Sequence, residues 1–189
     1  MKTIRPFAPV ACLLILLLLA PAQALARHST LATRDHLTPQ EVDLVKEAQA
    51  LDKRTAVFIK AIERRLLVLT GECAAASKQF QKDTEKWGEL PTGTRAELLT
   101  DIGKILDEAI NNIDDVSTRD ENNPLIAKAL RLLSAASTRF TAQLTNIRDQ
   151  SKETDERQAV EQALEYTQSI IEAAAKLPPE TKGKNKNKS

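Results

Sequence analysis

The strongest constraint on the fold of this chain is a four–three spacing of apolar residues between positions 126 and 147. Each residue of the series follows the previous one after four positions and then after three, which is the period of packed helices. No two-residue alternation typical of half-buried strands occurs anywhere along the chain. The spacing therefore predicts an all-α protein. The series consists of Ile126, Leu130, Leu133, Ser137, Phe140, Leu144 and Ile147.

Four helix starts are marked by a polar residue followed by favourable first-turn residues. Thr38 and Thr94 each have a glutamate three positions later, which predicts two capping boxes. Asn123 stands before a proline, and Thr154 before two acidic residues, and both arrangements favour a new helix. We expect helices to start at these positions, with a solvated turn before the last one.

The first apolar series runs from Leu44 to Leu69, and its rhythm resumes after Gly71 as far as Trp87. The segment is therefore either one long helix or a helix followed by a short one. We expect a break at Gly71, because the first helix then matches its neighbours in length. Amphipathic helices joined by short loops predict an antiparallel helical bundle of about four main helices.

Residues 1–26 have the features of a signal peptide. Two basic residues precede a short apolar run at positions 10–20, and Ala24 and Ala26 form the small-x-small pattern of a signal cleavage site. The run is shorter than a membrane span requires, so an uncleaved anchor is the less favoured alternative. We expect cleavage after Ala26, export through the general secretory route, and no permanent membrane span afterwards.

The remaining chain divides into three parts. We expect residues 27–37 to be a flexible mature N-terminus, residues 38–177 to form one helical bundle domain, and residues 178–189 to be a disordered lysine-rich tail. The whole chain has a net charge of +1. The signal and the tail hold the excess of cations, so the body is mildly acidic, which argues against nucleic acid as a partner.

Chemically reactive side chains are scarce. Cys73 is the only cysteine outside the predicted signal. We expect it to be buried, and the alternative is a disulfide to a second copy in a homodimer. His28 and His36 both precede the first helix, so the body lacks a histidine base or metal ligand. We therefore expect no enzymatic activity, no catalytic residues, no cofactor and no metal site. Acidic residues near position 120 lack the pattern of a calcium loop and are expected to be solvated.

A basic strip is expected on the first helix. Lys46, Lys53 and Lys60 recur every seven residues, with Arg54, Arg64 and Arg65 beside them. The strip would bind an acidic partner or an anionic surface, although a charged outer face that keeps the bundle soluble is the alternative.

A central polar layer is a second hypothesis. Thr55, Ser137 and Thr167 interrupt the apolar series near the middle of three helices, and Gly103 lies near the middle of the fourth. At one level of the bundle they would fix its register or line a pocket. Alternatively, each hydroxyl bonds the carbonyl one turn back.

These observations predict an exported, non-enzymatic helical-bundle protein, periplasmic or extracellular, that acts as a protein-interaction or structural module of the cell envelope. A periplasmic holdase chaperone or stress sensor is the alternative, and a small-ligand-binding bundle is the second alternative.

Overall fold

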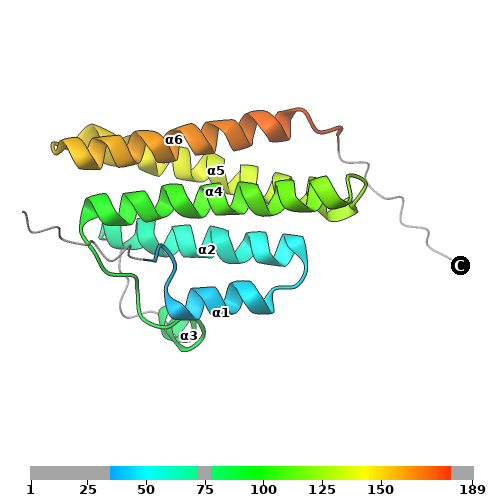
Figure 1. Cartoon of the computed structure of the whole chain (residues 1–189). Helices are drawn as coiled ribbons and strands as arrows, with labels where there is room; N and C mark the ends of the chain where they lie inside the picture. Colours follow the sequence, from blue (N-terminus) through cyan, green and yellow to red (C-terminus); the bar gives the residue numbers. More distant parts are fainter. Residues whose placement is uncertain (1–34, 72–77, 180–189) are drawn as a thin grey trace, which may run out of the picture. The chain divides into compact units, whose positions relative to one another are not determined.

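The computed structural model describes residues 35–71 and 78–179, with the backbone alone for residues 78–82. Within these ranges the chain is all-helical and contains no strand, which confirms the predicted fold class. The expected signal peptide, His28, Cys73 and residues 180–189 lie outside the described residues. The helices, shown in Figure 1, are α1 (Pro39–Glu47), α2 (Leu51–Thr70), α3 (Lys78–Trp87), α4 (Arg95–Arg119), α5 (Pro124–Gln150) and α6 (Thr154–Ala175).

The predicted helix starts are confirmed. Thr38 and Thr94 both form complete capping boxes, in which the hydroxyl accepts from the backbone N–H three residues later and the glutamate there accepts from the cap N–H. The Asn123 side chain caps α5 by accepting from the backbone N–H of Leu125 at 3.0 Å. The solvated turn before α6 is shorter than expected, because α5 continues to Gln150 and α6 begins at Thr154.

The apolar spacing between residues 44 and 87 looks continuous, but two breaks divide this segment into three helices. The break at Gly71 is confirmed: α2 ends at Thr70, and Gly71 has a φ of 71°, in the left-handed region that favours glycine. A second break between α1 and α2 was not predicted, because neither glycine nor proline marks it. The Arg54 Nε donates to the Ala48 carbonyl at 3.0 Å, so a side chain satisfies a backbone group left free there.

Helices α2, α4, α5 and α6 form the main bundle, and contacts along α2 and α5 fix their relative direction. Asp52 and Lys128, near the starts of these helices, pair at 2.6 Å, and Glu63 and Arg139 pair further along at 3.1 Å. Both pairs join α2 to α5 with the same sequence offset. These two neighbours therefore run parallel.

The other neighbouring pairs follow from contacts at the helix ends. Arg95 at the start of α4 donates to the Leu69 carbonyl at the end of α2, so these helices are antiparallel. Arg95 also pairs with Glu156 at the start of α6, so α4 and α6 run parallel. Thr141 bonds Thr167 between the antiparallel α5 and α6. Successive helices of the bundle alternate in direction, as expected, but two of the neighbouring pairs are parallel.

The bundle core is apolar over most of its length. Phe58, Ile102, Leu133 and Phe140 are almost completely buried, and each is expected to contribute about 1.5–3 kcal/mol by leaving water. These residues come from α2, α4 and α5, and the buried residues of α6 complete the core. Within the described residues, no helix combines the length and the hydropathy needed to cross a membrane.

Candidate functional site

The residues of the predicted basic strip do not form one continuous surface. Lys46 and Lys53 are exposed, whereas Arg64 and Arg65 are only 4 % and 1 % exposed and lie in the protein interior. Lys60 bonds Asp83 on α3 at 2.8 Å. Arg54 turns toward α4, where it donates to Asn112 at 3.0 Å in addition to its bond with Ala48. The strip is thus corrected to two exposed lysines, since α1, α3 and α4 cover the rest of that face of α2.

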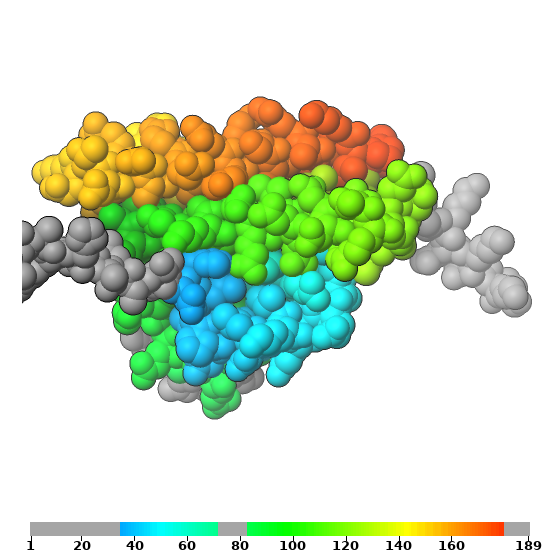
Figure 2. Space-filling view, in the orientation of Figure 1, coloured from blue at the N-terminus to red at the C-terminus, as the bar shows by residue number. Residues whose placement is uncertain are grey.

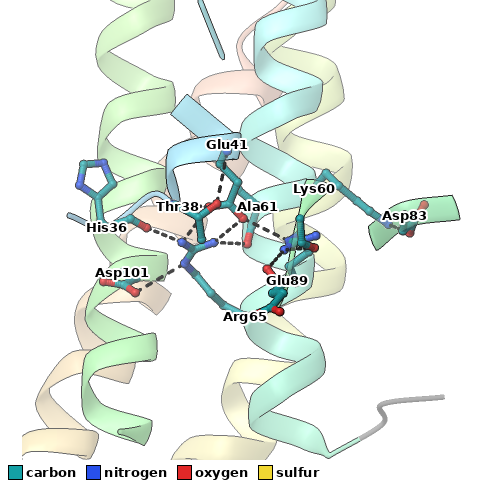
Figure 3. A network of polar contacts seen from close by, with 11 residues as sticks. His36, Thr38, Glu41, Lys60, Ala61, Arg65, Asp83, Glu89 and Asp101 are labelled. Atoms are coloured by element: carbon teal, nitrogen blue, oxygen red, sulfur yellow. Dashed lines mark hydrogen bonds and ion pairs between the residues drawn. The ribbon is translucent and has the colours of Figure 1, made fainter. Parts of the chain in front are cut away.

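Arg64 belongs instead to an ionic cluster formed by Glu41, Arg64, Arg65 and Asp101 (Figure 3). Glu41 lies at its centre and is completely buried. Its Oε2 accepts from Arg65 Nη2 and from the backbone N–H of Thr38, both at 2.9 Å. Its Oε1 accepts from Arg65 Nη1 at 3.1 Å and pairs with Arg64 Nε at 3.2 Å. One carboxylate therefore joins the capping box of α1 to two arginines of α2.

Arg65 extends the cluster to the chain before α1 and to α4. Its guanidinium donates to the backbone carbonyls of Ala61 and His36, and its Nε lies 3.6 Å from Asp101 Oδ2 on α4. Figure 3 shows the side chain between Glu41 and Asp101. Arg65 thus connects α1, α2 and α4 through a single side chain that is 1 % exposed.

Arg64 extends the cluster in the opposite direction, toward the end of α3. Its Nη2 donates to the carbonyls of Gly88, at 3.2 Å, and Glu89. Its guanidinium carbon also lies 5.9 Å from the centre of the Trp87 ring, within cation–π range. Burial lowers the pKa of Arg64 and the charge of Glu41 opposes this shift, so the side chain stays cationic at neutral pH.

Gly88 provides a further contact between α1 and α3. Its φ is 69°, a left-handed conformation that L side chains rarely adopt. A β-carbon at this position would lie 2.9 Å from the side-chain Cδ of Gln40 on α1. Glycine therefore satisfies both the turn after α3 and the close approach of α1.

The ionic cluster holds two cations and two anions, so its formal charges balance. Such groups lose their hydration when buried, and removing one partner leaves an uncompensated charge in the interior. The interactions are also directional, because a guanidinium fork fits a carboxylate in few orientations. The cluster therefore fixes how α1 and the end of α3 sit against α2.

An open groove of about 430 Å³ lies between α1, α2 and α3 and is named the α1–α3 groove. Its apolar lining includes Trp87, which Arg64 contacts from inside the protein. The charged lining residues are two lysines and one glutamate. The described lining comprises Leu44, Glu47, Ala48, Gln49, Lys53, Ala56, Val57, Lys86 and Trp87.

His36 is placed differently from the flexible segment in which it was predicted. Its Nε2 lies 2.6 Å from Glu108 Oε2 on α4, and its backbone carbonyl accepts from Arg65. The next residue, Leu37, is buried and packs with the core. The chain is therefore anchored from residue 36 onwards, which corrects the expected end of the flexible N-terminus at residue 37.

The predicted central polar layer is not a single layer. Thr55, Ser137 and Thr167 are all buried, but the contacts between helices place them at different levels. Thr167 lies level with Thr141, one turn beyond Ser137. The pairs between α2 and α5 place Thr55 level with Arg131, about 9 Å before Ser137 at 1.5 Å per residue.

The alternative explanation for these residues holds for two of the three. Thr55 donates to Leu51 O at 2.9 Å and Thr167 to Leu164 O at 2.8 Å, each about one helical turn back. Ser137 Oγ has no hydrogen-bond partner among the described residues. The layer hypothesis placed each residue at the midpoint of its helix. It is wrong because the first predicted helix is divided into α1 and α2, so Thr55 lies near the start of α2.

In the described part of the chain, no three histidine, cysteine, aspartate or glutamate side chains gather closely enough to hold a metal ion. The acidic residues near the turn between α4 and α5 lie on the exposed surface. They are Asp114, Asp115, Asp120 and Glu121.

Sequence reasoning missed the ionic cluster, although one signal pointed to it. Glu41 was assigned to the capping box alone, a role that it also fulfils. Arg65, however, lies three residues after Ile62 and seven after Phe58, in phase with the apolar series. An arginine in that phase indicates a buried cation that needs a buried carboxylate partner.

Comparison with protein-family models, with curated proteins and with solved structures finds no match to this chain.

Proposed function

We propose that this protein is an exported, non-enzymatic interaction module that binds an acidic amphipathic segment of another envelope protein in the α1–α3 groove. The observation that carries the proposal is the construction of this groove: an apolar lining with two lysines on separate helices, its walls joined by a buried ionic cluster. An apolar groove beside charged groups is a common way to bind a partner helix.

The choice of an acidic partner follows from charge. Lys53 and Lys86 outnumber Glu47 among the lining residues, and both lysines are exposed. The terminal segments outside the described residues carry a net positive charge, so they match this lining poorly: residues 1–34 have four basic and no acidic residues, and residues 180–189 have four lysines and one glutamate. A separate protein with acidic residues around an apolar anchor is complementary to both parts of the groove.

The role of the ionic cluster in this function is positioning. A groove whose walls are already in place binds with a smaller loss of conformational entropy than one that must be assembled. Glu41 holds the α1 wall, and Arg64 holds Trp87 on the α3 wall. Burying these charges costs free energy, and the result is a groove whose walls are in place before a partner binds.

Selection from a random peptide library displayed on phage, with the whole protein immobilised, tests this proposal. We expect selected peptides to carry apolar anchors flanked by aspartate or glutamate. A Lys53→Glu/Lys86→Glu variant should lose their binding, whereas the matched Lys152→Glu/Lys176→Glu variant, with exposed sites away from the groove, should keep it. Peptides without acidic residues, or equal binding by both variants, would contradict the proposal.

Export is a separate part of the proposal, supported by the signal features of residues 1–26. Denatured intact mass of protein recovered from the cell envelope, with and without reductant, should correspond to a chain starting at Arg27. A mass that includes residues 1–26 would show that the segment is retained. A doubled mass without reductant would reveal a disulfide through Cys73 and overturn its expected burial.

The described surface offers little support for a holdase that covers unfolded clients. Among the large apolar side chains of the described residues, only Leu132 is exposed, at 40 %. Client binding would require the bundle to open, and the ionic cluster opposes the release of α1.

A further inference from the structure

A second hollow lies on a different part of the bundle, between the parallel helices α4 and α6. It has a volume of about 420 Å³, within the usual range for small-molecule sites. Figure 2 shows α6 lying along α4 on the face in view. This α4–α6 groove shares no lining residue with the α1–α3 groove.

Gly103 contributes to this groove in a way that helix packing does not explain. Glycine inside a helix is less favourable than alanine. A β-carbon at position 103 would lie 3.9 Å from Gln162 Cγ and 4.0 Å from Tyr166 Cε2, which are ordinary van der Waals contacts. The helices therefore do not need glycine in order to approach each other. The missing side chain leaves room of the size of a methyl group beneath Gln162 and Tyr166, at the floor of the groove.

Tyr166 stands beside this space, and its ring lines the groove together with the Asp107 carboxylate of α4. Burial, and then the charge of Asp107, raises the pKa of Tyr166, so the phenol remains protonated at neutral pH. The groove therefore contains an uncharged phenol and one aromatic ring.

The remaining lining groups define the chemistry of a fitting ligand. Gln158 and Gln162 offer amides that donate and accept. Lys104 donates, and the carboxylates of Asp107 and Asp155 accept. Charges of both signs are present, which disfavours a strongly charged ligand, and no large aliphatic side chain lines the groove, which disfavours an apolar one. Hydroxyl groups, which both donate and accept, suit this mixture, and Tyr166 adds one aromatic ring.

We propose that the α4–α6 groove binds a neutral saccharide of one or two units. The amides and the carboxylates hold its hydroxyl groups, and the ligand occupies the groove above Gly103, beside Tyr166. This proposal goes beyond the protein-binding function and is independent of it.

Titration of the isotope-labelled full chain with cellobiose and with diacetylchitobiose, followed by amide NMR shifts, tests the inference. We expect saturable shifts at Gly103, Lys104, Gln162 and Tyr166 with at least one sugar. A Gln162→Ala variant should bind about fivefold more weakly, as expected for one lost hydrogen bond. The matched Gln143→Ala variant, exposed on α5, should bind as the unmodified protein does.

Gly103→Leu provides a second variant, in which a side chain fills the floor and should abolish binding. If its circular dichroism shows unfolding, the Gln162→Ala result decides alone. No shifts with either disaccharide, shifts confined to other helices, or equal affinity in the Gln162→Ala and Gln143→Ala variants would overturn the inference. Saturable binding of putrescine without binding of either sugar would also overturn it, because it would identify a site for cations.

Discussion

The α1–α3 end of the molecule and the α5–α6 pair are both buried helix contacts, but different forces hold them. At the first, Glu41, Arg64, Arg65 and Asp101 meet in the interior. Between α5 and α6, the buried side chains are mostly apolar, with one hydrogen bond between two threonines. The difference teaches that one bundle can combine a contact that depends on exact charge with one that depends mainly on volume.

The two contacts also differ in how they specify geometry. Apolar side chains of similar volume can replace each other with small adjustments, so the α5–α6 contact tolerates change. A buried guanidinium that loses its carboxylate partner is left as an uncompensated charge, so the charged contact does not tolerate such a change. We infer that the charged end is where the protein needs one arrangement of helices, consistent with the groove proposed there.

The largest expected effect tests the charged end. Glu41→Gln keeps the shape of the side chain but removes its charge, leaving Arg64 and Arg65 without their central partner. The free energy of unfolding should fall by about 3–5 kcal/mol in urea titrations. The matched variant Glu165→Gln, at an exposed position on α6, should stay within about 0.5 kcal/mol. If the free energy of unfolding fell by less than about 1 kcal/mol in Glu41→Gln, the two regions would not differ as proposed, because breaking a buried ion pair should cost more.

A smaller effect is expected when a buried residue of the apolar contact is replaced by one of similar volume. Leu144 is completely buried on α5, and Leu144→Met conserves its volume closely. The same urea titration should show a loss below about 1.5 kcal/mol. Leu144→Ala, which leaves a cavity, should lose about 2–5 kcal/mol and shows that the site is sensitive. The contrast would be wrong if Leu144→Met destabilised the protein as much as Glu41→Gln.

The smallest expected effect concerns the pair that joins the two regions, Asp52 on α2 and Lys128 on α5. The hydrogen bond from Lys128 lowers the pKa of Asp52, although burial opposes the shift. Because the folded pKa lies below the unfolded value of about 3.9, the stabilisation is present above that pH. It disappears as the pH falls through the folded pKa.

Urea titrations of the unmodified protein and of Lys128→Gln across acidic pH measure this contribution. The difference in unfolding free energy should be small at pH 7, since the lysine is largely exposed. It should vanish as the pH falls through the folded pKa of Asp52. A difference that is the same at every pH would show that the pair does not act through the charge of Asp52.

Much of the fold could be predicted because its signals are local. Thr38, Thr94 and Asn123 cap helices where expected, and Gly71 ends α2, since these residues act on backbone groups within a few positions. The division between α1 and α2 could not be predicted, because Ala48 and Ala50 have no intrinsic tendency to end a helix. The contact that holds α1 against α2 beyond this break joins Glu41 to Arg65, which are 24 positions apart.

The candidate site was predicted only in part. Lys53 was expected on a basic surface and lines the α1–α3 groove, whereas Lys86 and Trp87 join it from α3. Arg64 was expected on the same surface, but α1 and α3 cover it. Whether a basic residue is solvated or buried depends on which helix packs above it, and seven-residue spacing carries no information about that.

The amino-acid sequence by itself determined that this protein is helical, where most of its helices begin, and which residues of α5 face the core, because capping and periodicity act within one or two turns. Only the tertiary structure decided that α1 folds back on α2, that α2 and α5 run parallel, and that two arginines lie inside. Those outcomes depend on charges and surfaces that meet across many positions of the chain, where the net gain of a contact is set by its partners and its burial.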